Sequence, residues 1–296
     1  MGKNFDNHSG NLDFYDKPLF GKFRLKAGYT FIYIILAIQS IVVIYPIFLT
    51  IITSLKTNRE IFKNPFGMPT SFNLINYIKL FEKANYATYF LNSLIVSASS
   101  IIIILIVSSL ASYALSKYNF FGNNFLSLYF LAGLMIPIRL GTINIMQIFQ
   151  TLHLYNNLLS LIIIYSAMGI PAGILIFSGF IKEIPNELND SGRVDGCSEF
   201  GIFRKIIVPL LGPAIVVVAV YNLIPIWNDF WFPLVLINNE NLMTVPLATA
   251  KLFGQYETDY GIIFALLTSA AIPPMVLFIT LSRYFIKGLT AGAIKG

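Results

Sequence analysis

Charged residues are scarce in this sequence. Asp, Glu, Lys and Arg make up 11% of its 296 positions, and hydrophobic residues make up 56%. Soluble domains carry about 25% charged residues, so water is a poor candidate for the only solvent of this chain. The segment from Tyr118 to Ile181 contains one charge, Arg139, and four other stretches contain none: those between Lys26 and Lys56, Lys83 and Lys117, Lys205 and Asp229, and Asp259 and Arg283. Because a membrane-spanning helix needs about 20 apolar residues, each of the four can supply one and the longer segment can supply two.

These stretches predict an all-α polytopic membrane protein with six transmembrane helices. Their apolar runs are continuous, whereas the strands of a β-barrel alternate apolar and polar positions. The first run is too long for a signal-peptide core and no small-residue cleavage site follows it, so we expect that helix to be retained. The expected spans are residues 28–52, 88–116, 125–149, 158–181, 206–236 and 260–284.

Cysteine and histidine are nearly absent, which limits the chemistry available. Cys197 is the single cysteine, so a disulfide framework and a multi-cysteine metal site are excluded. His8 and His153 are too few and too far apart for a cluster of metal ligands. No Gly-x-x-x-x-Gly-Lys-[Ser/Thr] motif occurs, so we expect this chain to bind no ATP, metal or other cofactor itself.

Two other classes of membrane protein find little support. A secondary transporter or channel would need a relay of buried acids, and the predicted spans offer one acid, Asp229, and, apart from Arg283 at the end of the last span, one base, Arg139. A membrane-embedded enzyme would need a paired acid and base or a metal cluster, and neither His-x-x-x-His, clustered Asp nor Gly-x-Ser-x-Gly is present. We therefore expect a non-catalytic membrane subunit.

The formal net charge of +6 would suit nucleic-acid binding, but the placement of the basic residues favours membrane orientation instead. Six spans put both termini on one side, which then carries thirteen Lys and Arg residues against six on the other. We predict a multi-pass protein of the cell membrane with both termini in the cytoplasm. The expected segments outside the first span are a cytoplasmic extension at 1–27 (at the lipid interface or as a loosely ordered tail), an extracellular loop at 53–87, a core of five helices at 88–284 and a cytoplasmic tail at 285–296.

The polar loop between the fourth and fifth predicted spans has the signals of two short helices. Pro185 suits the first turn of a helix, and the acids Glu187 and Asp190 favour its positive end. The pair Asp195-Gly196 then breaks this helix, and Ser198 can cap a second one that leads into the fifth span.

The loop as a whole, residues 182–209, is predicted to be an interaction elbow on the cytoplasmic face. It carries small and apolar residues, namely Ser191, Gly192, Gly196, Leu188 and Val194. The small ones let a partner surface approach the backbone closely, and the apolar ones can anchor it. The alternative is a solvated connector, which is what most loops are.

The elbow resembles the EAA loop of binding-protein-dependent ABC importers. Asp190-Ser191-Gly192 stands where that family has Glu-Ala-Ala, Gly196 follows after three residues, and Val208-Pro209 closes the pattern. The preceding run Ile184–Leu188 also fits. The three departures keep charge sign or small size, although Gly and Ser in a short helix loosen it by up to about 1 kcal/mol for Gly relative to Ala.

Further motifs place the resemblance in the carbohydrate branch, which is related to the maltose permease subunits. The similarity covers roughly residues 85–296 and includes Asn92-Ser93, Trp227-Asn228-Asp229-Phe230, Arg283-Tyr284-Phe285 and the tail Lys287–Gly296. It implies a type I ABC importer permease fold and a sugar or oligosaccharide as cargo.

The resemblance also implies partners. These are a second, homologous permease forming the other half of the pathway, an ATP-binding cassette ATPase dimer that carries ATP and Mg²⁺, and an extracellular sugar-binding protein, in a lipid bilayer and without nucleic acid. The residues expected to couple to the ATPase are Glu187, Leu188, Asp190, Ser191, Gly192, Arg193, Val194, Asp195, Gly196 and Cys197. Cys197 fills a small position there, and packing suits it better than redox chemistry.

A pathway for sugars needs hydrogen-bonding side chains and aromatic faces inside the bilayer. The candidates are Asn92, Asn144, Gln147, Asn222, Trp227, Asn228 and Asp229. Asp229 either serves the pathway or caps a broken, wet segment between Pro225 and Pro233. Arg139 follows Pro137, and it can face the cavity, pair with Asp229 or reach water from a kink.

Overall fold

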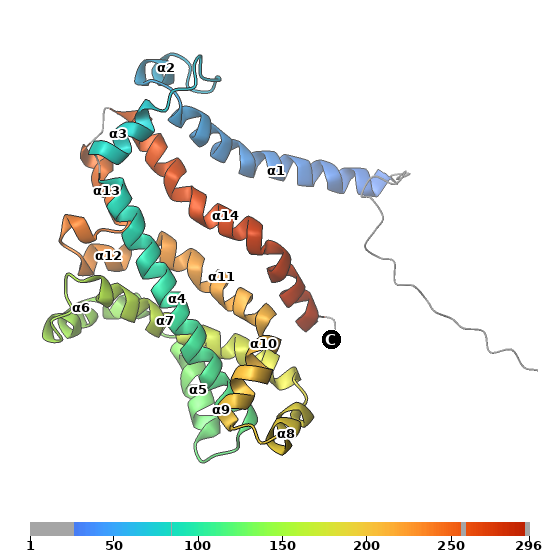
Figure 1. Ribbon diagram of the computed structural model, residues 1–296. Coiled ribbons are helices and arrows are strands. Elements are labelled where there is room, and N and C mark those ends of the chain that lie inside the picture. Colours follow the sequence, from blue (N-terminus) through green and yellow to red (C-terminus); the bar gives the residue numbers. More distant parts are fainter. Residues whose placement is uncertain (1–26, 84, 256–258, 294–296) are drawn as a thin grey trace, which may run out of the picture. The chain divides into compact units, whose positions relative to one another are not determined.

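The computed structural model describes residues 27–83, 85–255 and 259–293. Every regular element among these residues is a helix (Figure 1). The chain divides into a first unit, residues 1–49, and a second unit, residues 50–296. In chain order the helices are α1 (Ala27–Ser54), α2 (Asn58–Lys63), α3 (Ile75–Lys83), α4 (Tyr86–Lys117), α5 (Asn123–Gly133), η1 (Ile138–Gly141), α6 (Thr142–Thr151), α7 (Leu158–Glu183), α8 (Asn186–Val194), α9 (Glu199–Ile202), η2 (Phe203–Ile207), α10 (Val208–Leu210), α11 (Gly212–Asn228), α12 (Trp231–Leu236), η3 (Glu240–Leu242), α13 (Val245–Gln255) and α14 (Tyr260–Ala293).

The first unit, in its described part, is the helix α1 up to Leu49. Its side chains from Thr30 to Phe48 are exposed, and its apolar window has a mean hydropathy of 2.5. A helix that is apolar on all sides and exposed on all sides is suited to lipid rather than water. The predicted N-terminal extension lies outside the described residues, apart from Ala27.

Four helices are long and apolar enough to cross a membrane, and they cover Thr30–Ser54, Tyr86–Lys117, Leu158–Glu183 and Tyr260–Thr280. Two further pairs of helices pass the same test together but are sharply bent, by 82° and by 75°. Counting each bent pair as one span gives six, in the order that the charge-free stretches predict. The last of these helices, α14, continues to Ala293, well beyond the predicted end at residue 284.

The predicted span 125–149 is wrong as a single helix. It is the pair α5 and η1–α6, and the two parts meet at 82°. Pro137 lies in the break. Proline has no backbone N–H and disfavours helical geometry at the residue before it, which favours a break here, although helices run through Pro46 and Pro171.

The predicted span 206–236 is also broken. Its helical path begins earlier, at Glu199, bends by 75° at Leu211 and ends at Asn228, after which the separate helix α12 begins. Pro213 lies directly after the bend, where its missing N–H and its ring exclude a regular helical hydrogen bond to the preceding turn.

Within the second unit, α4 packs along α7, and α11 packs against both. Ser100 and Ser112 on α4 donate hydrogen bonds of 3.4 and 3.1 Å to backbone carbonyls of α7. The helices are so close that a Cβ atom added at Gly173 would lie 2.5 Å from Oγ of Ser108. Small residues and interhelical hydrogen bonds are the usual means of helix association in membranes, so α4 and α7 form one closely packed pair.

Candidate functional site

The loop at 182–209 folds as the two-helix elbow that the sequence predicts. Pro185 caps α8, Asp195 ends it, and Gly196 follows with φ of +75°, a conformation that glycine adopts without steric cost. The N–H of Gly196 donates to the carbonyl of Arg193 (3.0 Å) and the N–H of Cys197 to the carbonyl of Gly192 (2.9 Å). This is the Schellman arrangement, which satisfies the last carbonyls of a helix.

The second arm of the elbow starts at Ser198, whose Oγ accepts a hydrogen bond from the N–H of Gly201 at 3.2 Å. Helix α9 then continues through the π-helical turn η2 and α10 up to the bend at Leu211. The prediction of a first helix, a tight turn and a second helix leading into the fifth span is confirmed.

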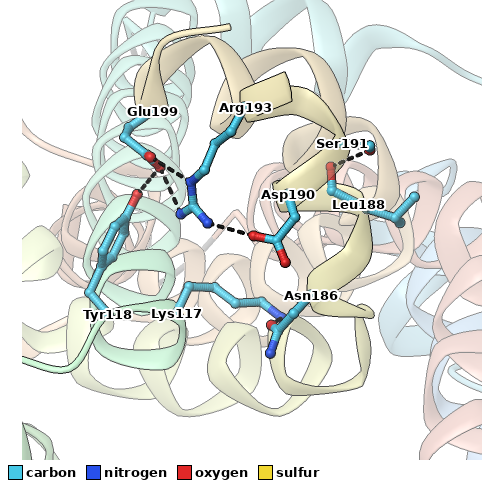
Figure 2. Close-up of polar contacts among 8 residues, drawn as sticks. All are labelled: Lys117, Tyr118, Asn186, Leu188, Asp190, Ser191, Arg193 and Glu199. Carbon is cyan, nitrogen blue, oxygen red and sulfur yellow. Dashed lines mark hydrogen bonds and ion pairs between the residues drawn. The ribbon is translucent and has the colours of Figure 1, made fainter. Parts of the chain in front are cut away.

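An arginine holds the two arms together. Arg193 on α8 donates from Nε to Oε1 of Glu199 (2.8 Å) and from Nη2 to its Oε2 (3.3 Å), and it also donates from Nη1 to Oδ1 of Asp190 (2.8 Å). Figure 2 shows this guanidinium between the two carboxylates, with Tyr118 approaching Glu199 from the far side. A planar fork that meets both oxygens of a carboxylate fixes orientation as well as distance.

The elbow is also tied to the end of α4. The hydroxyl of Tyr118 donates a short hydrogen bond to Glu199. Nζ of Lys117, the preceding residue, donates to the carbonyl of Ile184 (2.6 Å) and to Oδ1 of Asn186 (2.8 Å), at the start of α8. Lys117, the last residue of α4, therefore holds the first arm of the elbow, and Tyr118, which caps α4, holds the second arm.

These contacts shift the titration of the groups involved. The hydrogen bonds donated by Arg193, and then by Tyr118, lower the pKa of the Glu199 carboxyl. Burial, followed by the hydrogen bond to Glu199, raises the pKa of the Tyr118 hydroxyl. The pKa of Arg193 is raised, chiefly by its hydrogen bond to Glu199. All three groups keep the charge state that the network requires at neutral pH.

Three apolar side chains of the elbow are exposed among its polar ones. Val194 is 88% exposed, Phe200 is 63% exposed and Leu188 is exposed as well. Gly192 points the other way: a Cβ atom there would lie 2.9 Å from Cδ1 of Ile206. The small size of Gly192 thus serves the packing of one arm on the other, which corrects the expectation that it opens the backbone to a partner.

The other predicted coupling residues lie at the surface or close to it. Ser191 is exposed, and its Oγ donates to the carbonyl of Leu188 at 3.0 Å. Glu187, Asp195 and Gly196 are exposed, and Cys197 is half-buried against the apolar core. The structure brings the predicted coupling residues into one compact unit, and their contact with an ATPase remains a prediction.

The predicted pathway residues fall into two groups. Asn92, Asn222 and Trp227 are buried, and their N–H groups donate to backbone carbonyls: Asn92 to the 241–243 segment, Trp227 to Ala270, and Asn222 to its own helix. The bonds of Asn92 and Trp227 hold neighbouring segments together, and that of Asn222 stays within α11. The second group, Asn144, Gln147 and Asn228, is exposed. A pathway role stays a prediction for both groups, and only the second group presents its side chains at a surface.

Asp229 sits in the break between α11 and α12. Its carboxylate accepts hydrogen bonds from the hydroxyl of Tyr165 (2.9 Å) and the N–H of Phe232 (3.0 Å), and Nη2 of Arg139 lies 3.2 Å away. The Asp229 side chain is 8% exposed and that of Arg139 is 66% exposed. Of the alternatives that the sequence left open, the structure shows capping of a broken segment and an ion pair.

Sequence reasoning missed several residues of these sites. Lys117, Tyr118, Glu199 and Tyr165 make long-range polar contacts that no local pattern indicates. Trp231, whose Nε1 donates to Oγ1 of Thr142 at 2.9 Å, is a second polar link between the two broken spans. The one sequence feature that could have drawn attention to Trp231 is its position two residues after Asp229, which was already a candidate. Among the described residues, no group of three or more His, Cys, Asp and Glu side chains could hold a metal ion.

The fold and the elbow define a class of protein: a multi-pass helical membrane protein with a structured loop between two spans. Residues 104–291 match the family described as "Binding-protein-dependent transport system inner membrane component". The match covers more than half of the chain, so the chain belongs to this family of inner-membrane ABC transport permeases. Members of the family are transport subunits rather than catalytic enzymes, and the systems to which they belong depend on a solute-binding protein.

Curated relatives share most of their length with this chain. It is 30% identical over 286 residues to "Probable ABC transporter permease protein YurM" of Bacillus subtilis (strain 168), covering 97% of this chain and 94% of the relative. It is 34% identical over 276 residues to "Arabinooligosaccharides transport system permease protein AraQ" of Halalkalibacterium halodurans, covering 92% and 96%.

A solved structure has the same fold. It belongs to a bacterial ABC transporter involved in the import of the acidic polysaccharide alginate, with a TM-score of 0.79, 18% sequence identity, and coverage of 90% of this chain and 100% of the other. The predicted type I ABC importer permease fold is thereby confirmed.

Proposed function

We propose that this chain forms half of the transmembrane pathway of an ATP-driven sugar or oligosaccharide importer, and that the elbow at 182–209 docks on a separate ATPase. The observation that carries the proposal is the elbow itself, which is rigidly ordered by its own hydrogen bonds and presents Val194, Phe200 and Leu188 outward. A solvated connector would gain nothing from such order, whereas a docking surface needs a preformed apolar anchor.

The other subunits of the transporter follow from this role. ATP and Mg²⁺ belong to the ATPase dimer, and a second, homologous permease supplies the other half of the pathway. The elbow, the N-terminal extension and the C-terminal tail then lie in the cytoplasm, in agreement with the excess of Lys and Arg on that side. Closure of the ATPase dimer would move the docked elbow, and with it the spans, as a rigid-body switch.

The names of the relatives support a sugar as cargo. Besides arabinooligosaccharides, they include "Probable starch degradation products transport system permease protein AmyC" and "Multiple sugar-binding transport system permease protein MsmG". The exposed polar residues Asn144, Gln147 and Asn228 can hydrogen-bond hydroxyl groups. Because Asp229 compensates the charge of Arg139, the pair carries no net charge, which favours an uncharged sugar over an acidic one.

The proposal is tested by co-purifying the chain with its partner permease, the ATPase and the sugar-binding protein, and by measuring ATPase stimulation. Val194→Asp places a charge in the apolar anchor, and Gly196→Arg strains the left-handed turn and adds bulk. Both should reduce recovery of the ATPase with the complex. The matched control is Leu74→Asp, which adds the same charge at another exposed apolar position, in the 53–87 loop. Normal assembly and normal stimulation in both elbow variants would overturn the docking proposal.

A further inference from the structure

The end of α4 meets the elbow at several points, among them the carboxylate of Glu199, Lys117 and the ring contact of Tyr113 with Phe203. Glu199 accepts hydrogen bonds from Arg193 on α8 and from Tyr118, the residue that caps α4, so three segments meet at its two oxygens (Figure 2). Asp190 also accepts a bond from Arg193, but it lies three residues away on the same helix. Among the side-chain hydrogen bonds of the described residues, those of Glu199 alone link the first arm of the elbow, the second arm and the cap of α4.

The segments that meet at Glu199 belong to a stiff part of the protein. Helix α7 leads directly into the elbow, and α4 packs along α7 with Gly173 in contact with Ser108. Lys117 adds a second tie from α4 to the start of α8. Two independent ties and a closely packed helix pair leave the elbow few ways to tilt relative to α4.

The connection to the fifth span is different. The second arm ends at Leu211 and turns by 75° into α11. At Gly212, directly after the turn, an added Cβ atom would meet no neighbour within 4 Å. A force applied to the elbow thus reaches α4 through side-chain ties and reaches α11 through a sharp bend of the backbone, at which Leu211 is buried.

We infer that Glu199 is a positioning residue for coupling: by joining Arg193 to Tyr118 it fixes both arms of the elbow to α4, so that the elbow and the α4–α7 pair move as one body. This inference rests on the proposed docking of the elbow on an ATPase. Glu199 does not itself touch cargo or nucleotide; it sets the angle at which the docked surface is held.

Because Arg193 and Glu199 are partly exposed, the positioning role of Glu199 can be tested without unfolding the protein. The side chains of Arg193 and Glu199 are 42% and 50% exposed, and exposed ion pairs contribute little to stability. Removing Glu199 should therefore leave a folded, assembled transporter with a less firmly held elbow. Changes within a coupling network alter coupling by a factor on the order of 2 to 30.

The experiment uses the complete transporter reconstituted in lipid. Glu199→Ala and Tyr118→Phe should retain assembly and basal ATPase activity. Stimulation by the sugar-loaded binding protein should fall on the order of 2- to 30-fold, with more ATP hydrolysed per sugar imported. The matched control is Glu240→Gln, which removes another exposed carboxylate paired with a basic side chain, that of Lys251. Wild-type stimulation in both Glu199→Ala and Tyr118→Phe would overturn the inference.

A covalent replacement provides a second and sharper measurement. In a Cys197→Ser background, Tyr118→Cys and Glu199→Cys are combined and bridged with a short bifunctional thiol reagent. If the elbow and α4 move as one body, bridging should restore the stimulation that the unbridged double variant lacks. If bridging instead stops transport, the two segments must separate during the cycle and the inference fails, whatever Glu199→Ala does to folding.

Failure of the positioning role of Glu199 can be told apart from failure of the proposed docking of the elbow. If Val194→Asp and Gly196→Arg impair assembly while the Glu199 and Tyr118 variants behave as wild type, docking stands and the positioning role is lost. If none of the four variants changes assembly or stimulation, both are overturned.

Discussion

The guanidinium of Arg139 lies 3.2 Å from the carboxylate of Asp229, although ninety residues separate them in the sequence. Arg139 follows the break of one bent span, near Pro137, and Asp229 follows the end of the other, between α11 and α12. The pair, with the hydrogen bond from Trp231 to Thr142, joins these two positions. The interrupted helices are thus held at a defined separation.

The two partners of this pair should differ in their effect on stability. Asp229→Ala leaves the hydroxyl of Tyr165 and the N–H of Phe232 without their acceptor, which costs about 1–3 kcal/mol for a buried donor. Arg139→Ala removes a mostly exposed partner and should cost much less. Thermal unfolding of the purified protein measures both. Asp229→Asn retains an acceptor and should fall between them, and equal losses for Asp229→Ala and Arg139→Ala would contradict the account.

Asn228→Ala should lower sugar uptake while sparing assembly. Asn228 is exposed beside Asp229, and a single lost hydrogen bond to cargo corresponds to about 0.5–1.5 kcal/mol, or roughly a 2- to 10-fold effect. Uptake into proteoliposomes is the measurement. Asn119→Ala is the control, because Asn119 is an exposed asparagine in the loop between α4 and α5. Unchanged uptake in Asn228→Ala would remove this residue from the pathway.

Two glycines of α7 should respond to alanine with opposite signs. An added Cβ at Gly173 would lie 2.5 Å from Oγ of Ser108, so Gly173→Ala should destabilise the protein by about 1–3 kcal/mol through overpacking. At Gly179 an added Cβ meets nothing within 4 Å, so Gly179→Ala should stabilise the helix by roughly 0.5–1 kcal/mol.

Thermal unfolding of the two glycine variants, together with the double variant Gly173→Ala/Ser108→Gly, checks this prediction. The double variant should recover much of the loss because it removes the side chain that the new methyl group strikes. A stabilised Gly173→Ala protein would show that α4 and α7 are not closely packed.

The Glu60 network should make stability depend on pH in the acid range. Hydrogen bonds from Thr70 first, and then from the backbone N–H of Thr57, lower the pKa of Glu60 from 4.5 to about 2. A carboxyl whose pKa is depressed on folding adds stability above its unfolded pKa, and that stability is lost as the pH falls through the folded pKa. Wild type should therefore exceed Glu60→Gln in thermal stability at pH 7, with the difference shrinking between about pH 4.5 and pH 2.

Glu82→Gln on α3 is the control for the pH experiment, since it replaces an exposed carboxylate outside this network. A difference between wild type and Glu60→Gln that does not change with pH would contradict the assignment.

The sequence predicts the parts of this protein that depend on local chemistry. Charge-free stretches indicate the spans because burying a charge in lipid is costly, and the elbow follows from Pro185, Gly196 and Ser198, each of which acts on its own backbone. Proline alone does not locate the two breaks, because Pro137 lies in a break whereas Pro46, Pro171 and Pro225 lie inside helices.

Contacts between distant segments were not predictable. Tyr118 and Glu199 are 81 residues apart, and nothing in either neighbourhood indicates that they meet. The partners of Asn92 and Trp227, in the 241–243 segment and at Ala270, lie far along the chain, and no local pattern indicates them. Arg139 and Asp229 could be paired on charge alone because the predicted spans offer few alternatives.

The most direct test of the central claim is site-specific photocrosslinking from Val194 in the assembled transporter. With a photoreactive amino acid at Val194, the elbow should crosslink to the ATPase subunit, and the same probe at Leu74 should not. Crosslinks from Val194 to lipid alone, or none at all in a complex that hydrolyses ATP and imports sugar, would contradict the assignment of this elbow as the ATPase docking site.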